Sequence, residues 1–319
     1  MFAVLGEALL DMVQRGNGHT YAARPGGSPF NIAIGLRRLD HDTALMARLS
    51  RGGLGAILRE HAAANSLDLS ACVDTDDAAT LAFASVDADG RASYDFYVDG
   101  TADWGWTPAE LRGLPDATKV VHTGSLATAI SPGSEALLAM VERLHAHGAH
   151  LLSYDPNVRP ALAGRRDDAV ERTERYVGAS HVVKASDDDL AWLYPGLDLA
   201  DVMRRWLELG PELMVVTRGE SGCLAMTARG ASMSRDGLSV KVVDTIGAGD
   251  SFQSGLLSAL ADAECTTPGS VGQLSTTELE VVLDRALRVS AMTCEREGAD
   301  PPTRAEYDAR RSGDGQFGG

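Results

Sequence analysis

The sequence predicts an α/β protein in which helices wrap a mostly parallel central sheet, with a small β-strand lid set against it. Short apolar runs alternate with longer amphipathic segments along most of the 319 residues, which is the pattern of parallel strands joined by helices. The runs are nearly continuous, as in strands covered on both faces. Hydrophobic residues make up 44% of the chain, enough for a large core. We expect residues 1–319 to form one domain.

Five apolar runs are predicted to be strands of the main sheet. They are Ala3–Leu5, Lys119–His122, His150–Tyr154, His181–Lys184 and Leu213–Thr217. Helices are expected between them, and the segment from Ser134 to His145 carries its apolar residues at helical spacing after a Ser-Pro-Gly turn.

Two stretches depart from this alternation and predict the lid. Residues 12–24 and 80–102 contain antiparallel-type strands without partner helices, and Asp89-Gly90 is expected at the turn of the second hairpin. Their exposed edges or faces could pair two copies of the chain as a homodimer. The glycine-rich residues 310–319 are expected to form a flexible tail.

The charge balance argues against several classes of partner. The chain has 45 acidic and 29 basic residues, a formal net charge of −16, which opposes broad binding to nucleic acid or to an anionic membrane surface. No apolar run approaches the roughly 18 residues of a membrane span. The apolar N-terminal stretch contains two acidic residues, Glu7 and Asp11, so we interpret it as a buried first strand and not as a signal peptide. Four cysteines without a CxxC pair indicate reduced thiols and a cytoplasmic location.

The strongest chemical signal is VVDTIGAGDSF at residues 242–252. It predicts a strand at Val242-Val243, a glycine turn, and then a helix. Gly247 and Gly249 let backbone N–H groups converge at the helix start, where they and the helix dipole favour negative charge. Asp250, in the first turn, is expected to be ionised. A carboxylate beside such N–H groups suits phosphoryl transfer to a hydroxyl, although GxGD alone is also compatible with an ordinary helix cap.

This string resembles the C-terminal signature of the ribokinase-like (PfkB) carbohydrate kinases, D-T-x-G-A-G-D-x-F. Residues 25–36, PGGSPFNIAIGL, resemble the N-terminal signature G-G-x-x-x-N-x-A of the same family. Two such signatures in the right order are far more specific than either alone. Within the family, GEALLD, DPNVRP, VKASDDDLAWLYPG and VVTRG are most similar to bacterial fructokinases.

The resemblance implies a ribokinase-like three-layer α/β/α sandwich that uses ATP to phosphorylate a sugar hydroxyl, with D-fructose to D-fructose 6-phosphate as the expected reaction. Asp250 would be the general base, and the N–H groups of Gly247, Ala248 and Gly249 the anion hole. Asp11, Gly26, Gly27 and Asn31 would bind the sugar together with Asp250. Taken singly, Asp11 would be read as a turn residue and Asn31 as a helix cap.

Further positions carry expected roles on the same basis. Arg159, after a strand end, would lie near the transferred phosphoryl group and the sugar, the alternative being a surface ion pair. Phe96 and Tyr97 are the candidate lid aromatics, and strand alternation places them on opposite faces. Ser28 stands where ribokinase has Lys, which argues against ribose.

Several further residues are expected to contact ATP. Thr217, Gly219 and Gly222 resemble the family's T-x-G-x-x-G turn along the ATP phosphates, where Gly247 and Gly249 would also lie. Lys184 matches a basic residue near the nucleotide, the alternative being a plain surface lysine.

At the expected metal positions the sequence departs from the family pattern. Ser186 and Asp189 replace the Asn and Glu that organise Mg²⁺ through water in many members, and a solvated helix start is the alternative. Asp244 corresponds to a monovalent-cation position, so K⁺ use stays open.

Three rival functions remain. A 2-keto-3-deoxygluconate kinase would need a cation for the substrate carboxylate, which Arg159 or a lid residue could supply. A catalytically silent sugar-binding regulator could use the same fold. A hydride-transfer enzyme is disfavoured because no complete dinucleotide fingerprint is present.

Overall fold

The main sheet has eight strands and is parallel through its centre. A computed structural model describes residues 1–15, 19–86 and 92–314 of the chain. The strand order is β14 (Ser232–Arg235), β13 (Cys223–Thr227), β12 (Leu213–Thr217), β11 (Val182–Ser186), β10 (Leu151–Asp155), β9 (Val120–Gly124), β1 (Phe2–Leu5) and β4 (Thr43–Met46). Strands β12 to β4 pair in parallel, and β13 and β14 add an antiparallel edge. The five predicted strands are therefore confirmed within about two residues.

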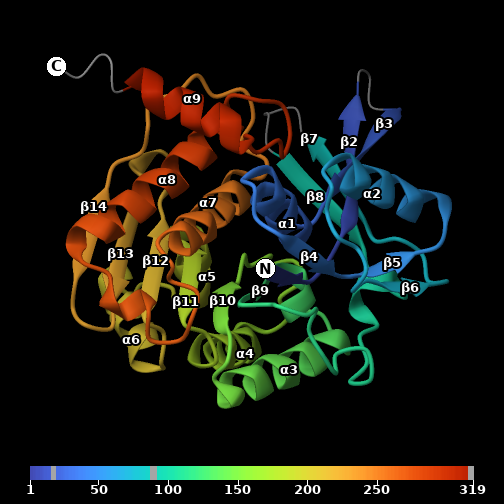
Figure 1. Cartoon of the computed structure of the whole chain (residues 1–319). Coiled ribbons are helices and arrows are strands. Elements are labelled where there is room, and N and C mark those ends of the chain that lie inside the picture. The colour runs from blue at the N-terminus through green and yellow to red at the C-terminus, as the bar shows by residue number, and fades with distance from the viewer. Residues whose placement is uncertain (16–18, 87–91, 315–319) are drawn as a thin grey trace.

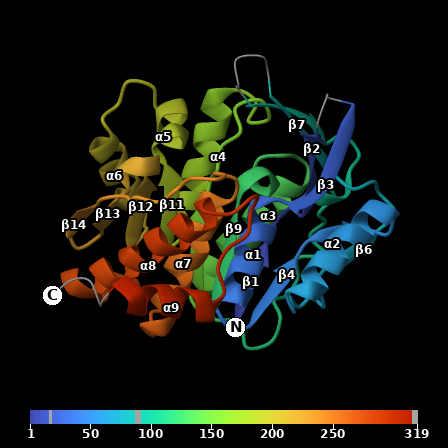
Figure 2. The ribbon, with the colours of Figure 1, turned by 90° about the horizontal axis from the view of Figure 1, so that it is seen from above.

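Helices cover both faces of this sheet and make the three-layer α/β/α sandwich (Figures 1 and 2). One layer holds α1 (Ser28–Arg38), α2 (Gly53–Ala64), α7 (Ala248–Asp262) and α8 (Thr276–Cys294), and the other α3 (Gly133–His147), α4 (Arg166–Gly178), α5 (Asp187–Leu193) and α6 (Leu199–Glu208). Successive strand residues serve opposite layers: Val4 packs in the first core, and Ala3 and Leu5 in the second. This two-sided burial explains the continuous apolar runs.

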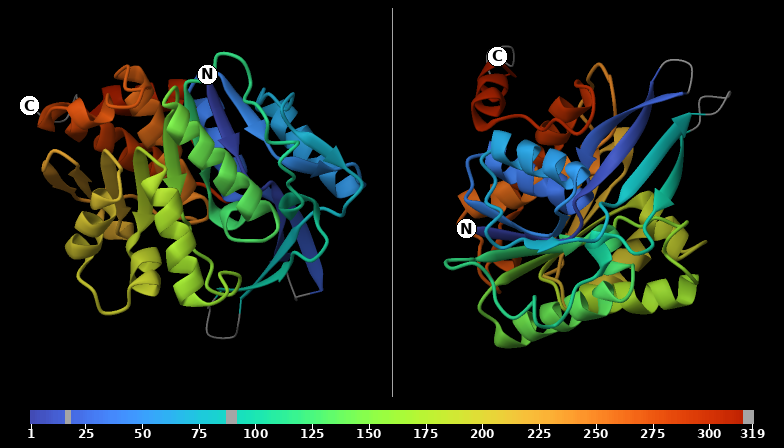
Figure 3. Two further views of the ribbon diagram at one scale, coloured as in Figure 1. Left: turned by 90° about the horizontal axis from the view of Figure 1, so that it is seen from below. Right: turned by 90° about the vertical axis from the view of Figure 1, so that its right-hand side faces the viewer.

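A second, small sheet projects from one side of the sandwich (Figure 3). It is formed, in spatial order, by β3 (Thr20–Gly26), β2 (Leu9–Arg15), β7 (Leu81–Val86) and β8 (Ala92–Tyr97). The outer pairs are antiparallel as expected, but the central pair β2/β7 is parallel. Asp89-Gly90, the expected hairpin turn, lies outside the described residues. A separate two-stranded sheet pairs β5 (Arg48–Ser50) with β6 (Val73–Thr75).

Two sequence-based expectations are wrong. Val242 and Val243 are more than half exposed and belong to no strand, because β14 ends at Arg235 and the Val243 N–H instead donates to the Cys294 carbonyl. The tail expected at residues 310–319 is helical over residues 310–314, since α9 spans Arg304–Asp314 and Arg310 pairs with Glu295 at 3.1 Å, whereas residues 315–319 lie outside the described part of the chain.

In the part of the chain that the structure describes, no helix combines the length and the apolar character needed to cross a bilayer.

Candidate active site

A cavity of about 380 Å³ lies at the carboxyl ends of the central strands, bounded on one side by the small sheet. This edge of a parallel α/β sheet is where ligands bind, and the volume is in the range of small-molecule sites. Its walls come from both sheets, from α1 and from the start of α7. The lining residues are Glu7, Leu9, Asp11, Gly27, Ser28, Asn31, Ala82, Phe96, Ser125, Leu126, Asn157, Arg159, Thr245, Ile246, Gly247, Gly249 and Asp250.

Asp250 lies in the first turn of α7 and is held from α1. Gly247, in the left-handed conformation (φ +74°), ends the incoming loop and starts the helix. The Ser28 hydroxyl donates to Asp250 Oδ1 at 2.6 Å, and the Asn31 amide donates to Oδ2 at 2.8 Å. Each carboxylate oxygen has a further lone pair, so the side chain is fixed in orientation and can still accept a proton from the cavity.

The predicted anion hole is smaller than expected. Gly247 and Gly249 line the cavity, but the Ala248 N–H donates to the Thr245 carbonyl at 3.2 Å and Ala248 does not line it. The tight turn before the helix uses that N–H group.

Lys184 stands behind this turn and supplies positive charge. Its Nζ lies 3.2 Å from where a side chain on Gly249 would begin, and it pairs with Asp155 at 2.8 Å. Burial lowers the pKa of Lys184, but the carboxylate of Asp155 outweighs this and the net pKa is raised, so the ammonium keeps its charge. Lys184 is only 4% exposed, which rules out a plain surface lysine.

Asp11 points into the cavity from the middle of β2, not from the end of the first strand. Burial raises the pKa of Asp11 to about 6, helped by the charge of Asp250 and opposed by Arg159. Gly26 does not line the cavity. A side chain there would begin 2.1 Å from Asp11 Oδ2, so this glycine makes room for the Asp11 carboxylate. Gly27 lines the cavity as expected.

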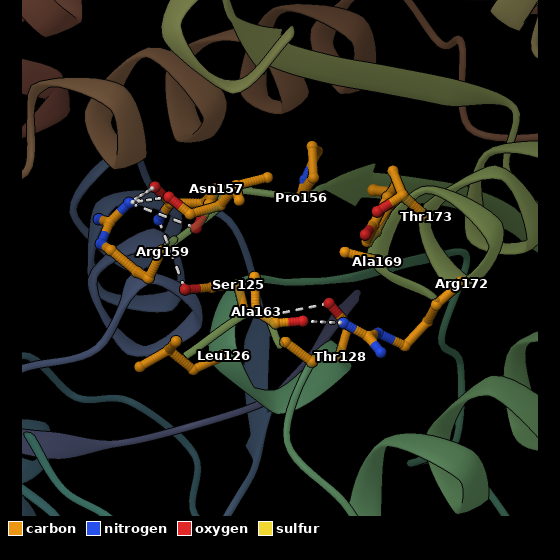
Figure 4. A pocket seen from close by; sticks show the side chains of 13 residues that line it. Ser125, Leu126, Thr128, Pro156, Asn157, Arg159, Ala163, Ala169, Arg172 and Thr173 are labelled. Atoms are coloured by element: carbon orange, nitrogen blue, oxygen red, sulfur yellow. Dashed lines mark hydrogen bonds between the residues drawn. The ribbon is translucent and has the colours of Figure 1, made fainter. Parts of the chain in front are cut away.

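Arg159 is exposed and lines the cavity, and a neighbouring turn aims it. Figure 4 shows this turn from the side of a second, smaller pocket. The Arg159 Nη1 donates to Asn157 Oδ1 at 2.7 Å. This partner is a neutral amide, so the guanidinium charge stays available to an anion. Asn157 (φ +38°) and Ser125 (φ +56°) are non-glycine residues in the left-handed region at the ends of adjacent strands. Such strain clusters at functional sites. A small second cavity of about 20 Å³ lies behind them.

Only one of the two candidate aromatics reaches the cavity. Phe96 lines it, whereas Tyr97 is 60% exposed and packs edge-on against Phe83 with ring centroids 5.3 Å apart. Strand alternation puts the two rings of β8 on opposite faces, as expected, and of the two candidates it is Phe96, not Tyr97, that faces the cavity.

The predicted nucleotide turn lies outside this cavity, after β12. Thr217 ends the strand, and Gly219 (φ +52°) has open space where a side chain would stand. Gly222 has a different reason to be glycine: a side chain would begin 2.0 Å from the Arg235 carbonyl oxygen. Its role in the fold is therefore backbone packing between β13 and β14.

The predicted metal positions are occupied by backbone contacts. Ser186 and Asp189 form the capping box of α5, and Asp189 also accepts the Val158 N–H at 2.7 Å. Asp244 accepts the N–H groups of Ile246 and Gly298 and so ties two loops together. Among the described residues, no cluster of three His, Cys, Asp or Glu could hold a metal directly.

The comparisons with known proteins agree with this geometry. The profile of the pfkB family carbohydrate kinases matches residues 2–306. The chain belongs to this family. It is 34% identical to a fructokinase of Rhizobium leguminosarum bv. trifolii, over 86% of this chain and 84% of that one, and 32% identical to fructokinase-2 of Solanum lycopersicum, over 94% and 93%.

Solved structures show the same fold. The fructokinase of Xylella fastidiosa with bound ATP superposes with a TM-score of 0.89 at 24% identity, covering 98% of both chains. The fructokinase of Vibrio cholerae O395 with fructose, ADP and calcium gives 0.83 at 25% identity, covering 97% of both. The chain is thus a PfkB sugar kinase with a ribokinase-like fold.

Two residues of this kinase site were missed as site residues from the sequence. Ser28 was considered only for sugar preference, yet it binds Asp250; it stands three residues before Asn31, on the same face of α1. Asp155 is the buried partner of Lys184. Its position at the end of a predicted strand could have marked Asp155 as a candidate site residue. Its ion pair with Lys184 could not be predicted, because Lys184 comes from the neighbouring strand.

Ser28→Ala should lower kcat by about tenfold and leave the KM for ATP unchanged. A hydrogen bond to a charged group contributes about 1.5–3 kcal/mol, and losing it would let the Asp250 carboxylate rotate. Steady-state kinetics would measure this. Ser180→Ala, which removes an equally buried hydroxyl bonded to the Tyr176 carbonyl, is the matched control. A kcat equal to or above that of wild type would contradict the positioning role of Ser28.

Proposed function

We propose that the chain is an ATP-dependent fructokinase that makes D-fructose 6-phosphate, with Asp250 as the general base. The observation that supports this most is the Asp250 carboxylate, held by Ser28 and Asn31 beside the start of α7 and facing a cavity for a small polar molecule. The fructokinases named above, related across most of their length, support fructose as the sugar.

The proposed chemistry is a single in-line transfer. Asp250 accepts the proton of the sugar hydroxyl while the hydroxyl oxygen attacks the terminal phosphorus of ATP, and the bond to the ADP oxygen breaks. The N–H groups of Gly247 and Gly249 and the ammonium of Lys184 stabilise charge on the phosphoryl oxygens. Arg159 assists from the opposite wall of the cavity. Mg²⁺, carried in mainly by the nucleotide phosphates, would neutralise further charge, with Asp189 reaching it only through water.

The small sheet is the proposed lid. Phe96 covers the cavity from β8, so movement of this sheet toward the sandwich would exclude water from the sugar and limit ATP hydrolysis. The nucleotide would lie along the Thr217–Gly219 turn. K⁺ near Asp244 would act on the loop before Gly247, because Asp244 braces that loop.

The charge of the cavity favours a neutral sugar over a keto-deoxy acid. Three carboxyl side chains, Glu7, Asp11 and Asp250, line it against the single guanidinium of Arg159. A substrate carboxylate would meet like charge, which costs several kcal/mol in such a site. A silent sugar-binding regulator would have no need for the carefully held Asp250.

With ATP and Mg²⁺, kcat/KM for fructose should exceed that for 2-keto-3-deoxygluconate by roughly 10² or more, the ratio expected from a few kcal/mol of repulsion. Coupled release of ADP, with and without K⁺, would measure both rates, and sugar-free ATP hydrolysis serves as the background. A faster rate on the keto-deoxy acid would refute fructose as the substrate, and no sugar-dependent ADP release would refute the kinase proposal.

We further propose a homodimer in which the outer face of the small sheet meets a second copy. On that face Tyr21, Phe83 and Tyr97 stack edge-on in a row, with Tyr97 60% exposed. Exposed aromatic clusters are typical of interfaces.

Tyr97→Ser should convert this dimer to monomer at micromolar concentration, measured as a solution mass by light scattering. Leu197→Ser, at a residue 56% exposed between α5 and α6, is the control and should leave the mass unchanged, because these helices lie across the sandwich from the small sheet (Figure 1). A monomeric wild type would contradict the proposed interface.

A further inference from the structure

Two buried carboxyl groups at the base of the small sheet take no part in the proposed transfer of the phosphoryl group. Glu7 lies in the loop between β1 and β2, and Asp103 in the 3₁₀ turn Ala102–Trp104 after β8. Their exposed fractions are 1% and 0%. They are neighbours, because the N–H of Ala8, the residue after Glu7, donates to Asp103 Oδ1 at 2.9 Å.

Asp103 joins the segments through which the small sheet leaves the sandwich. Ala8, its donor, leads directly into β2. The hydroxyl groups of Thr80 and Thr101, which precede β7 and follow β8, are 2.6 Å apart, and the Thr80 carbonyl accepts the Leu10 N–H. Asp103 therefore lies where three of the four strands begin or end.

Glu7 connects the same point to the wall of the sugar cavity. Its Oε2 accepts the Ala127 N–H at 3.0 Å, and the Ser125 hydroxyl also bonds to its carboxyl. Ser125 Oγ in turn accepts from Asn157 Nδ2 at 3.5 Å, and Asn157 holds Arg159 (Figure 4). Ser125 and Asn157 are the two strained residues, and such backbone persists only where its surroundings hold it in place. Glu7 supplies that support for the first of them.

The groups that bond to this pair are backbone N–H and hydroxyl groups, which do not neutralise charge. Two ionised carboxylates in one fully buried cluster are therefore unfavourable, and one proton relieves both burial and repulsion. Burial raises the pKa of Glu7 to about 7 and that of Asp103 to about 7, and the charge of Glu7 contributes to the second shift.

The charged groups packed around the pair do not remove the need for a proton. The charge of the nearby Asp250 carboxyl on α7 raises the pKa of Glu7 further. Arg48 on β5 donates to the Ala102 carbonyl and pairs with Asp77 and Glu110. Asp11 and Arg159 face the shared cavity and partly offset each other.

We propose that Glu7 and Asp103 form a proton-sharing pair of positioning residues that links the base of the small sheet to the turns that aim Arg159. The kinetic part of this inference rests on the proposed sugar-kinase function. When the small sheet moves, the pair holds the turns at Ser125 and Asn157 in place. Arg159 therefore keeps its position relative to the sugar.

The proton can be tested without any substrate. The pKa of Glu7 in the folded protein is above its usual 4.5, so the folded state binds this proton more tightly than the unfolded state does. Stability therefore falls as pH rises from about 4.5 to about 7. Glu7→Gln, which cannot ionise, should show a smaller fall in the urea midpoint between pH 5 and pH 8 than wild type.

Glu208→Gln on the exposed face of α6 is the control and should keep the wild-type fall. Glu7→Gln/Asp103→Asn should flatten it further. The same fall in Glu7→Gln as in wild type would overturn the shared proton.

The positioning role is tested by kinetics on the full chain. Glu7→Ala should raise the KM for the sugar about tenfold and lower kcat, and should change the KM for ATP less than twofold; tenfold corresponds to about 1.4 kcal/mol. Glu7→Gln should restore most of the loss, because an amide can donate and accept where a protonated carboxyl does.

Glu7→Gln as damaging as Glu7→Ala, or equal changes in both KM values, would overturn the positioning role. If Glu7→Ala does not fold, Glu7→Asp replaces it: the shorter side chain withdraws the carboxyl from the Ala127 N–H and should raise the KM for the sugar but not that for ATP, and an unchanged sugar KM would overturn the positioning role. A wild type that is inactive on every sugar would reject the kinase proposal. The pH dependence of the urea midpoint would still test whether Glu7 and Asp103 share a proton.

Discussion

The contact between α1 and the Asp250 carboxylate is the interaction on which the rest of the site depends. Ser28 and Asn31 are 222 and 219 residues away from Asp250 in sequence, yet both donate to it. Their hydrogen bonds join the first helix of the chain to α7 and fix where a proton can be accepted. The cavity, the small sheet and the glycine turn before α7 are all arranged around that fixed point.

Parallel pairing explains how the other groups reach the same place. Strands β9, β10 and β11 are neighbours in register, so the turns after β9 and β10 and the middle of β11 lie at one edge of the sheet. This brings Ser125 and Arg159 to one cavity wall, and it places the buried Asp155–Lys184 pair next to Gly249, although these residues come from separate segments. Carboxyl groups of Asp11 and Asp250 and the guanidinium of Arg159 therefore face one cavity.

Much of this arrangement could be predicted from the sequence. Continuous apolar runs revealed the main strands, and the two glycine-rich signatures named the residues that the structure brings together, Asn31 and Asp250 among them. Local patterns were enough because helix starts and strand ends are local events. The partner of each side chain is not local, which is why the Ser28–Asp250 and Lys184–Asp155 contacts were missed.

The errors have similar causes. Val242 and Val243 have strand propensity, but the Val243 N–H bonds to the end of α8 and both side chains stay exposed. The choice between Phe96 and Tyr97 could not be made from the sequence, because alternation does not say which face of the strand turns toward the cavity. Asp189 looked like a solvated or metal-facing acid until the capping box and the Val158 N–H accounted for its oxygens.

Single-turnover phosphorylation of fructose by Asp250→Asn, measured together with fructose binding to the same variant, tests the assignment of the base most directly. The amide keeps the size of the side chain but cannot take up the proton. Fructose should bind within about threefold of wild type while the transfer rate falls by roughly 10²–10⁴, the range for loss of a general base. A wild-type transfer rate in this variant would contradict the role of Asp250.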